Sequence, residues 1–195
     1  MSETEVRRRP GGRSARVRAA VLDATVELLR AHGLEGLKVG DVAERAGVHE
    51  TSIYRRWRNR ENLLIDALLA ASEVLRVPDT GRVRDDLIAY ATDLAAFLAT
   101  PTGHALEHTL AIAGDDPVMR QARDRYWAYR SERSQQMITR AVARGELPDT
   151  VDPRLVIEML VSPVHFRVLL TREEIEDGMP ARVVDALLAG ISPVR

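Results

Sequence analysis

The sequence predicts an all-α fold in which a small basic domain precedes a larger helical one. Val, Ile and Leu recur mostly at spacings of three and four residues, and long stretches of alternating apolar and polar residues are missing. Charge divides the chain: residues 1–60 hold 13 Lys and Arg against 8 Asp and Glu, whereas residues 61–195 hold 15 against 21. This division is typical of a protein in which only the first part meets phosphates.

Composition excludes several classes of protein. The 195 residues include no Cys, which rules out disulfides, thiolate catalysis and Cys-bound metals. No apolar run approaches the ~18 residues of a membrane span, and no basic-then-apolar leader opens the chain. We therefore expect a cytoplasmic protein that has no membrane partner and no cofactor.

The N-terminal segment is predicted to be a basic arm followed by a helix. Residues 1–13 contain three consecutive Arg, a Pro and a Gly pair, a composition that resists helix formation. The arm either follows a DNA groove beside a bound helix or only adds non-specific attraction. From Ser14, an N-cap residue type, apolar residues repeat at three and four and predict a helix that ends before Gly33.

Residues 41–57 are predicted to form two short helices separated by a tight turn. Apolar residues recur at helical spacing up to Ala46, and Gly47 supplies the left-handed conformation that ends a helix. A second helix should begin near His49. Its polar and reachable side chains are His49, Glu50, Thr51, Ser52, Tyr54, Arg55 and Arg56. Two helices with this turn form a helix-turn-helix, whose second helix enters the major groove of DNA.

The run GLEGLKVGDVAERAGVHETSIYRRWRNRENLLIDALL resembles the DNA-binding domain of the TetR (tetracycline repressor) family of bacterial transcription regulators. The resemblance covers residues 14–66. The matching positions are Val42, Ala43, Ala46, Gly47, Val48, the run from Thr51 to Tyr54, Trp57, Asn59, Arg60 and Glu61. Lys38, His49 and Thr51 depart from the commonest family pattern. Neither Lys nor His is a favoured N-cap residue, so phosphate contacts that depend on those caps are weakened.

The helix-turn-helix geometry and the resemblance together assign the expected DNA contacts. We expect Thr51 and Ser52 to contact base edges, and His49 and Arg55 are further candidates for base contacts. For Arg55, a phosphate is the alternative partner. The residues expected at phosphates or beside the DNA backbone are Tyr54, Arg56, Arg60, Lys38 and Arg16. Arg60 follows the N-cap residue Asn59, so it lies where free amides already favour a phosphate.

Helical segments continue to the end of the chain. One begins after Asn59 and runs to Pro78, and the others are expected at 82–99, 102–113, 117–144, 153–170 and 180–188. The last two resemble the pair by which the TetR family dimerises as a four-helix bundle. We expect a homodimer, because two recognition helices that read a palindrome are the usual geometry. The predicted domains are 14–60 for DNA binding and 61–195 for effector binding and dimerisation.

One motif in the second half has an enzymatic interpretation. His104, Glu107 and His108 spell H-x-x-E-H, the pattern of inverted zinc peptidases, in which both His bind the metal and the Glu acts as base. A metal sensor that uses His104 and His108 with His165 is a second alternative. We favour pocket-lining or core histidines and predict no metal site, because a hydrolase needs a further carboxylate ligand and a larger substrate chamber.

An effector pocket is expected between the helices of the larger domain. The candidate lining residues are Tyr90, Phe97, His104, His108, Tyr126, Trp127, Met137, His165 and Phe166, which supply most of the aromatic and soft side chains there. No Lys and no dense Arg cluster indicates an anionic ligand. The expected effector is therefore an apolar or aromatic, weakly polar small molecule.

These observations lead to one favoured function. The sequence predicts a sequence-specific DNA-binding regulator, a dimeric repressor that a small molecule releases from a palindromic operator. A ligand-independent DNA-binding regulator, a metal-responsive sensor and a zinc hydrolase are the alternatives. The operator, the regulated genes, the effector and the choice between repression and activation are not encoded in any motif.

Overall fold

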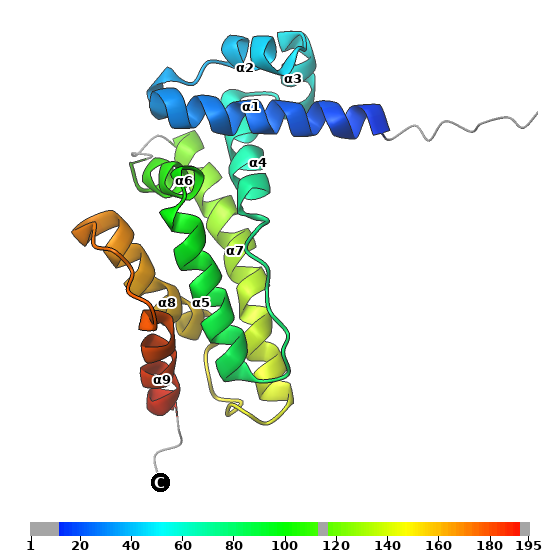
Figure 1. Cartoon of the computed structure of the whole chain (residues 1–195). Helices are drawn as coiled ribbons and strands as arrows, with labels where there is room; N and C mark the ends of the chain where they lie inside the picture. Colours follow the sequence, from blue (N-terminus) through cyan, green and yellow to red (C-terminus); the bar gives the residue numbers. More distant parts are fainter. Residues whose placement is uncertain (1–11, 113–116, 192–195) are drawn as a thin grey trace, which may run out of the picture. The chain divides into compact units, whose positions relative to one another are not determined.

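The computed structural model describes residues 12–112 and 117–191, and every regular element in these ranges is a helix (Figure 1). The all-α prediction is therefore confirmed. The chain divides into two compact units, Met1–Ala70 and Ala71–Arg195, called here the N-terminal unit and the C-terminal unit. Residues 1–11 of the predicted arm lie outside the described ranges. The functional boundary expected between residues 60 and 61 stays a prediction.

Four helices begin in the described part of the N-terminal unit, residues 12–70. They are α1 (Gly12–Gly36), α2 (Val39–Ala46), α3 (Glu50–Trp57) and α4 (Arg60–Ser72). The helix predicted to end before Gly33 is interrupted there, because Gly33 has φ 68°, but helical structure resumes and α1 continues to Gly36. Ser14 is not the N-cap that the sequence predicted, since the helix already begins at Gly12 and Ser14 lies within its first turn.

Packing between these helices fixes their arrangement. The side chains of Val21, Leu22, Leu29, Leu37, Val42, Ile53 and Leu63 are all at most 3% exposed. Burying each such side chain contributes roughly 1.5–3 kcal/mol. Because α2 and α3 have only eight residues each, too few for stability in isolation, their conformation depends on this shared core.

Helix α4 is shorter than predicted. The sequence predicted a helix as far as Pro78, but α4 ends at Ser72 and the chain turns there, with the amide of Leu75 donating to the carbonyl of Ser72 at 3.0 Å. The guanidinium of Arg130 also donates to the carbonyls of Ser72 and Leu75. The early end of α4 is thus stabilised by a side chain 58 residues further along, which local periodicity does not report.

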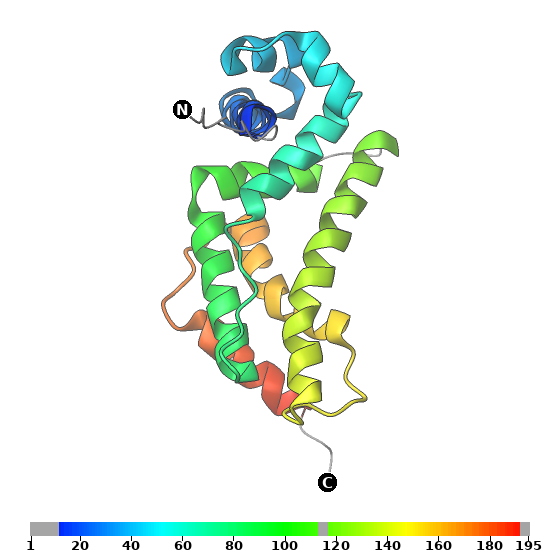
Figure 2. The ribbon, with the colours of Figure 1, turned by 90° about the vertical axis from the view of Figure 1, so that its right-hand side faces the viewer.

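The C-terminal unit contains the remaining helices (Figure 2). They are α5 (Val83–Ala99), α6 (Pro101–Ile112), α7 (Pro117–Ala143), α8 (Pro153–His165), the π-helix η1 (Phe166–Thr171) and α9 (Met179–Ile191). The predicted segments are all present, except that the segment 153–170 changes to π-helical geometry at Phe166. None of the helices in the described part of the chain has the length and apolar character that crossing a membrane requires.

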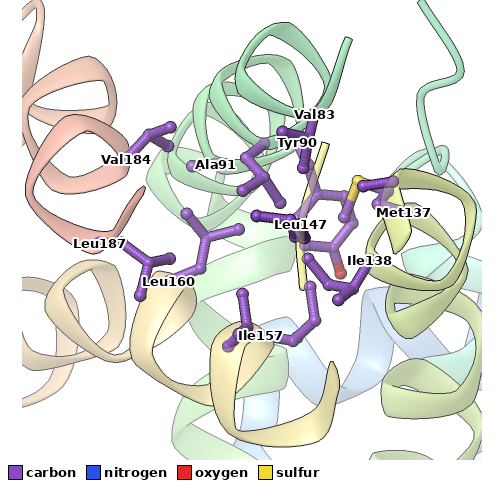
Figure 3. Packing of buried hydrophobic residues seen from close by; sticks show 13 residues of the cluster. Val83, Tyr90, Ala91, Met137, Ile138, Leu147, Ile157, Leu160, Val184 and Leu187 are labelled. Atoms are coloured by element: carbon purple, nitrogen blue, oxygen red, sulfur yellow. The ribbon is translucent and has the colours of Figure 1, made fainter. Parts of the chain in front are cut away.

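Helix α5 is the centre of this unit, since it contacts α6, α7, α8 and α9. Figure 3 shows the resulting core, in which side chains from several helices meet. Its most deeply buried members are Leu87, Ala91, Met137, Ile138, Ala141, Leu160 and Val184, each at most 1% exposed. Val156 and Ile157 of α8 complete the wall, so this core fixes α7 and α8 relative to α5.

A close backbone contact forms the corner between α5 and α6. A Cβ atom added to Gly103 would lie 2.1 Å from the carbonyl oxygen of Phe97, so only glycine fits there. The hydroxyl of Thr100 donates to the same carbonyl at 2.6 Å and accepts from the amide of Gly103 at 3.0 Å. The corner therefore sets the direction of α6, which carries Glu107 and His108.

Candidate functional site

The turn between α2 and α3 has the predicted form. Gly47 is left-handed, with φ 66° and ψ 37°. Its amide donates to the carbonyl of Glu44 at 3.1 Å, and the amide of Val48 donates to the carbonyl of Ala43 at 3.0 Å. This pair of bonds is the Schellman motif, which satisfies the last carbonyls of a helix and reverses the chain. The predicted helix-turn-helix is confirmed.

Helix α3 has one buried face and one exposed face. Ile53 and Trp57 are 1% and 6% exposed, and the indole of Trp57 donates to the Asp66 carboxylate of α4 at 3.0 Å. On the other face, Ser52 is half-buried, and the exposed residues are His49, Glu50, Thr51, Tyr54, Arg55 and Arg56. The predicted DNA-contacting residues of α3 thus lie together on its exposed face. The contacts of Ile53 and Trp57 on the opposite face fix the position of the helix.

The first turns of α2 and α3 lack the usual side-chain caps. Lys38 and His49 occupy the two N-cap positions, and neither side chain accepts a capping hydrogen bond. However, a Cβ added to Gly40 in the first turn of α2 would lie 2.9 Å from Oε1 of Glu50. The Glu50 carboxylate therefore lies beside the positive end of α2, where the helix dipole favours an anion. Sequence reasoning grouped Glu50 only with the reachable residues.

The predicted phosphate-binding arginines differ in their present contacts. Arg56 donates to the Ser14 hydroxyl at 3.3 Å, and its guanidinium lies 5.5 Å from the centre of the Trp57 ring. Arg60 donates to the carbonyl of Leu37 at 3.4 Å and pairs with Glu61 at 3.3 Å. These bonds are long and therefore weak.

Two further residues that the sequence analysis singled out in the N-terminal unit are Arg16 and Asn59. Arg16 is exposed on α1 and donates to the carbonyl of Gly12 at 3.2 Å. The Asn59 side chain accepts from the amide of Asn62 at 2.8 Å, so the predicted cap of α4 is confirmed. Arg60 accordingly lies in the first turn of a capped helix.

A large cavity lies within the C-terminal unit. Its volume is about 1520 Å³, it is partly open to the surface, and its walls come from α5, α6, α7, α8 and η1. Seven of the predicted effector-binding residues line it: Tyr90, Phe97, His108, Tyr126, Trp127, His165 and Phe166. The indole of Trp127 packs edge-on against the imidazole of His165, with ring centres 5.7 Å apart. An aromatic, mainly apolar ligand fits such walls.

Two predicted lining residues lie elsewhere. Met137 is fully buried in the core of the C-terminal unit, because it occupies the face of α7 that packs against α5 and α8. His104 is exposed on α6 and stacks its ring near that of His108, with centres 6.4 Å apart. Helical periodicity identified both as candidates but does not distinguish a core face from a cavity wall.

Glu107 and His165 form a buried polar pair in the cavity wall. Oε1 of Glu107, which is 2% exposed, lies 2.5 Å from Nε2 of His165. Nδ1 of His165 lies 2.9 Å from the carbonyl of Val161, and since a carbonyl only accepts, Nδ1 carries a hydrogen. Burial lowers the pKa of His165, but the hydrogen bond and the charge of Glu107 outweigh it, so the pKa is raised. Glu107 therefore favours the protonated form of the His165 ring.

This pairing contradicts both metal interpretations of the H-x-x-E-H motif. Glu107, the residue expected to act as base, pairs with His165. Within residues 12–112 and 117–191, no three His, Asp or Glu side chains are grouped as a metal site would require. The proposed three-histidine set of His104, His108 and His165 is therefore not assembled.

Arg130 is a cavity residue that sequence reasoning missed. It is 5% exposed, and it donates through Nη1 to the carbonyls of Ser72 at 3.3 Å and Leu75 at 3.4 Å, and through Nη2 to the Tyr90 hydroxyl at 3.1 Å. Burial raises the pKa of nearby Tyr126, against the opposing effect of the Arg130 charge. In an Arg-rich helix, only its spacing of four from Tyr126 indicated that Arg130 faces inward.

Helices α8 and α9 carry an exposed apolar strip. Leu155 and Met159 are each 52% exposed, and both border a groove of about 260 Å³ that also includes Leu187 and Ile191. Leu160 and Val184 of the same helices point into the core. Helix α8 thus has a core face and a separate apolar outer face, and the groove beside that outer face continues along α9.

Comparisons with known proteins cover both units. Residues 21–67 match the family model described as "Bacterial regulatory proteins, tetR family", and residues 77–187 match "Tetracyclin repressor-like, C-terminal domain". The second model alone spans more than half of the chain. The two matched segments contain the helix-turn-helix and the walls of the cavity, respectively.

Individual relatives agree with these models. The HTH-type transcriptional regulator AqdR of Rhodococcus erythropolis is 37% identical over 179 residues, which cover 91% of this chain and 86% of that protein. The DNA-binding transcriptional repressor TetR of Mycobacteroides abscessus is 31% identical, covering 87% and 90%. Among solved structures, the TetR family transcription regulator SCO0332 superposes with a TM-score of 0.77 at 32% identity, covering 91% of this chain and 99% of the other.

Proposed function

Because the chain belongs to the TetR family of bacterial transcription regulators, we propose that it is a homodimeric repressor which a small-molecule effector releases from a palindromic operator. The observation that carries this proposal is the exposed polar face of α3. The buried side chains of Ile53 and Trp57 on the opposite face hold this helix in position. The repressor role is supported by the name of the Mycobacteroides abscessus relative. The protein works in the cytoplasm, where its operator is.

The contacts with DNA follow from that face. Thr51 and Ser52 lie in the first turn of α3 and contact base edges, since the N-terminal part of a recognition helix points into the major groove. His49 and Arg55 read neighbouring bases, or Arg55 takes a phosphate. Phosphate and backbone contacts come from Tyr54, Arg56, Arg60, Lys38 and Arg16. The long hydrogen bonds of Arg56 and Arg60 are weak enough for phosphate oxygens to replace them.

Two chains are needed to read a palindrome. The exposed Leu155 and Met159 of α8, with the adjoining groove along α9, supply the apolar surface through which a second copy of the chain binds. The resulting two-fold axis relates two copies of α3. Half-sites separated by about one helical turn of DNA, or a multiple of it, then match the protein.

The cavity in the C-terminal unit is the effector site. An effector lowers the DNA affinity only to the extent that it binds more tightly to a conformation that does not fit the operator. TetR-family members are regulators and not enzymes, so His104, Glu107 and His108 do not catalyse hydrolysis. They contribute instead to the surface and the wall of α6, with Glu107 held by His165.

The first test is selection of bound duplexes from a random DNA pool, followed by sequencing. We expect an enriched palindrome. A variant carrying Thr51→Ala and Ser52→Ala should lose the enrichment and keep weak, salt-sensitive binding. If the wild-type protein enriches nothing, the proposed sequence-specific function is wrong. If a site is enriched but no small molecule releases the protein from it, sequence-specific DNA binding is supported and regulation by an effector is contradicted.

A further inference from the structure

The buried charges of the cavity are not balanced. Several carboxylates and guanidinium groups line it, but among those that the structure describes only Glu107 and Arg130 are buried. Glu107 has a partner, because its Oε1 lies 2.5 Å from Nε2 of His165. Arg130 has no carboxylate within 4.0 Å in the described part of the chain. One positive charge therefore remains in the wall without an anionic partner.

A buried cation without an anion is unusual in a folded protein. Ionised side chains are rarely buried unless they are paired, because removal from water costs more than neutral hydrogen bonds return. The present partners of Arg130 are all neutral: two backbone carbonyls at 3.3 and 3.4 Å and a phenol at 3.1 Å. A guanidinium has five N–H donors, and these three bonds leave others available.

A second donor lies at the same place. The Tyr90 hydroxyl, in a side chain that is 4% exposed, accepts from Arg130. Its own hydrogen has no acceptor among the residues that the structure describes, so it can donate to a ligand oxygen next to the guanidinium. Both residues line the cavity. Their donors suit an acidic group with two oxygens, since carboxylates bind arginine in a bidentate manner.

We propose that the effector of this cavity is an organic anion with an apolar body, whose acidic group pairs with Arg130 in place of the carbonyls of Ser72 and Leu75. The apolar body lies against Phe97, Trp127 and Leu106, which are also in the cavity wall. This inference rests on the proposed effector-binding function and names the chemistry of its ligand. It replaces the apolar or aromatic, weakly polar small molecule that the sequence favoured.

The pairing also has a consequence for α4. Ser72 is the last residue of this helix, and α4 is the element through which the chain passes from the N-terminal unit to the C-terminal unit. A carboxylate is a stronger acceptor for Arg130 than either carbonyl, so it competes with the two bonds that hold this end of α4. The ligand anion thereby changes the environment of the segment 72–75.

The test compares carboxylic acids with their uncharged isosteres. Straight-chain and aryl-substituted acids of graded length, each with its primary amide, are titrated calorimetrically into the full-length protein. We expect the best-fitting acids to bind about tenfold or more tightly than their amides. In Arg130→Gln, this preference should fall to within about twofold, while the affinity for amides is unchanged. Arg130→Lys keeps the positive charge but loses the planar guanidinium that binds two oxygens at once, so it should retain part of the preference for acids over amides.

Arg133→Gln is the matched control. It lies on the same helix and pairs with Glu73 and Tyr129, outside the cavity, so the acid preference should be unchanged. The proposal is overturned if amides bind the wild-type protein as tightly as acids, if no acid in the series binds, or if Arg130→Gln retains the preference. The wild-type comparison stands even if Arg130→Gln does not fold.

Mobility-shift assays with the selected operator separate this inference from the proposed function. If an amide binds the protein and releases the operator as effectively as the corresponding acid, the proposed preference for an anion is wrong. The proposed effector-responsive repressor would still stand. An acid that binds through Arg130 without releasing the operator would support the anion site and contradict the proposed release.

Discussion

The indole of Trp57, the last residue of α3, donates a hydrogen bond to Oδ2 of Asp66 in α4 at 3.0 Å. The same oxygen accepts from Nη2 of Arg18 in α1 at 3.4 Å. One carboxylate oxygen therefore joins three helices of the N-terminal unit. Because α3 has only eight residues, its end is positioned by this contact as much as by its own hydrogen bonds.

Asp66→Ala should lower the free energy of unfolding of the N-terminal unit by about 1–3 kcal/mol, since hydrogen bonds to charged groups contribute in this range. Asp66→Asn keeps an acceptor for the Trp57 indole and loses only the charge, so its effect should be smaller. Thermal denaturation followed by tryptophan fluorescence measures both. If the alanine variant is as stable as the wild type, this contact does not stabilise the position of α3.

Ser52→Ala should weaken binding to the selected operator by about 1–3 kcal/mol, because a hydroxyl that reads a base loses its partner. Binding to random DNA should be unchanged. Mobility-shift titrations with both duplexes provide the comparison. An unaltered affinity for the operator would exclude Ser52 from base reading.

Arg60→Ala should weaken binding to specific and random DNA alike. If Arg60 contacts a phosphate, the slope of log affinity against log salt falls by about one. Arg154→Ala is the control, because this exposed arginine pairs with Glu158 on α8 of the C-terminal unit. A slope that matches the control would show that Arg60 does not neutralise a phosphate.

Gly103→Ala should destabilise the C-terminal unit by about 3 kcal/mol, because a rigid backbone carbonyl lies 2.1 Å from the new Cβ. The expected result is a lowered melting temperature and loss of the cavity geometry around Glu107. Gly190→Ala in α9 is the matched control, since a Cβ there meets nothing within 4 Å. Similar melting temperatures for the two variants would contradict the close approach of Gly103 to the carbonyl of Phe97.

The pair of His165 and Glu107 predicts a pH dependence of stability. The pKa of His165 is raised in the folded protein above its ordinary value of 6.5. The folded state therefore binds the proton more tightly than the unfolded state, and the resulting stabilisation is complete below about pH 6.5 and lost as the pH rises through the folded pKa. Melting temperatures of the wild type and His165→Gln, compared across this interval, should converge towards alkaline pH. A constant or widening difference would contradict the charged pair.

The sequence determined the helices and the DNA-binding motif, because both depend on local patterns. Gly47 ends α2 by its own backbone freedom, and Asn59 caps α4 by a bond to a residue three positions away. The exposed face of α3 followed from the i, i+4 spacing of Ile53 and Trp57. Such interactions span a few residues, so they can be inferred without knowledge of the fold.

Only the tertiary structure decided how the polar residues of the C-terminal unit are used. Periodicity made Met137 and His104 candidates for the cavity wall and missed Arg130, but packing placed Met137 in the core, His104 at the surface and Arg130 in the cavity wall. The end of α4 at Ser72 and the partnership of Glu107 with His165 depend on contacts 58 residues apart in each case. A polar side chain is stabilised by whichever partner the fold brings to it, and this physical dependence on distant residues leaves no local pattern in the sequence.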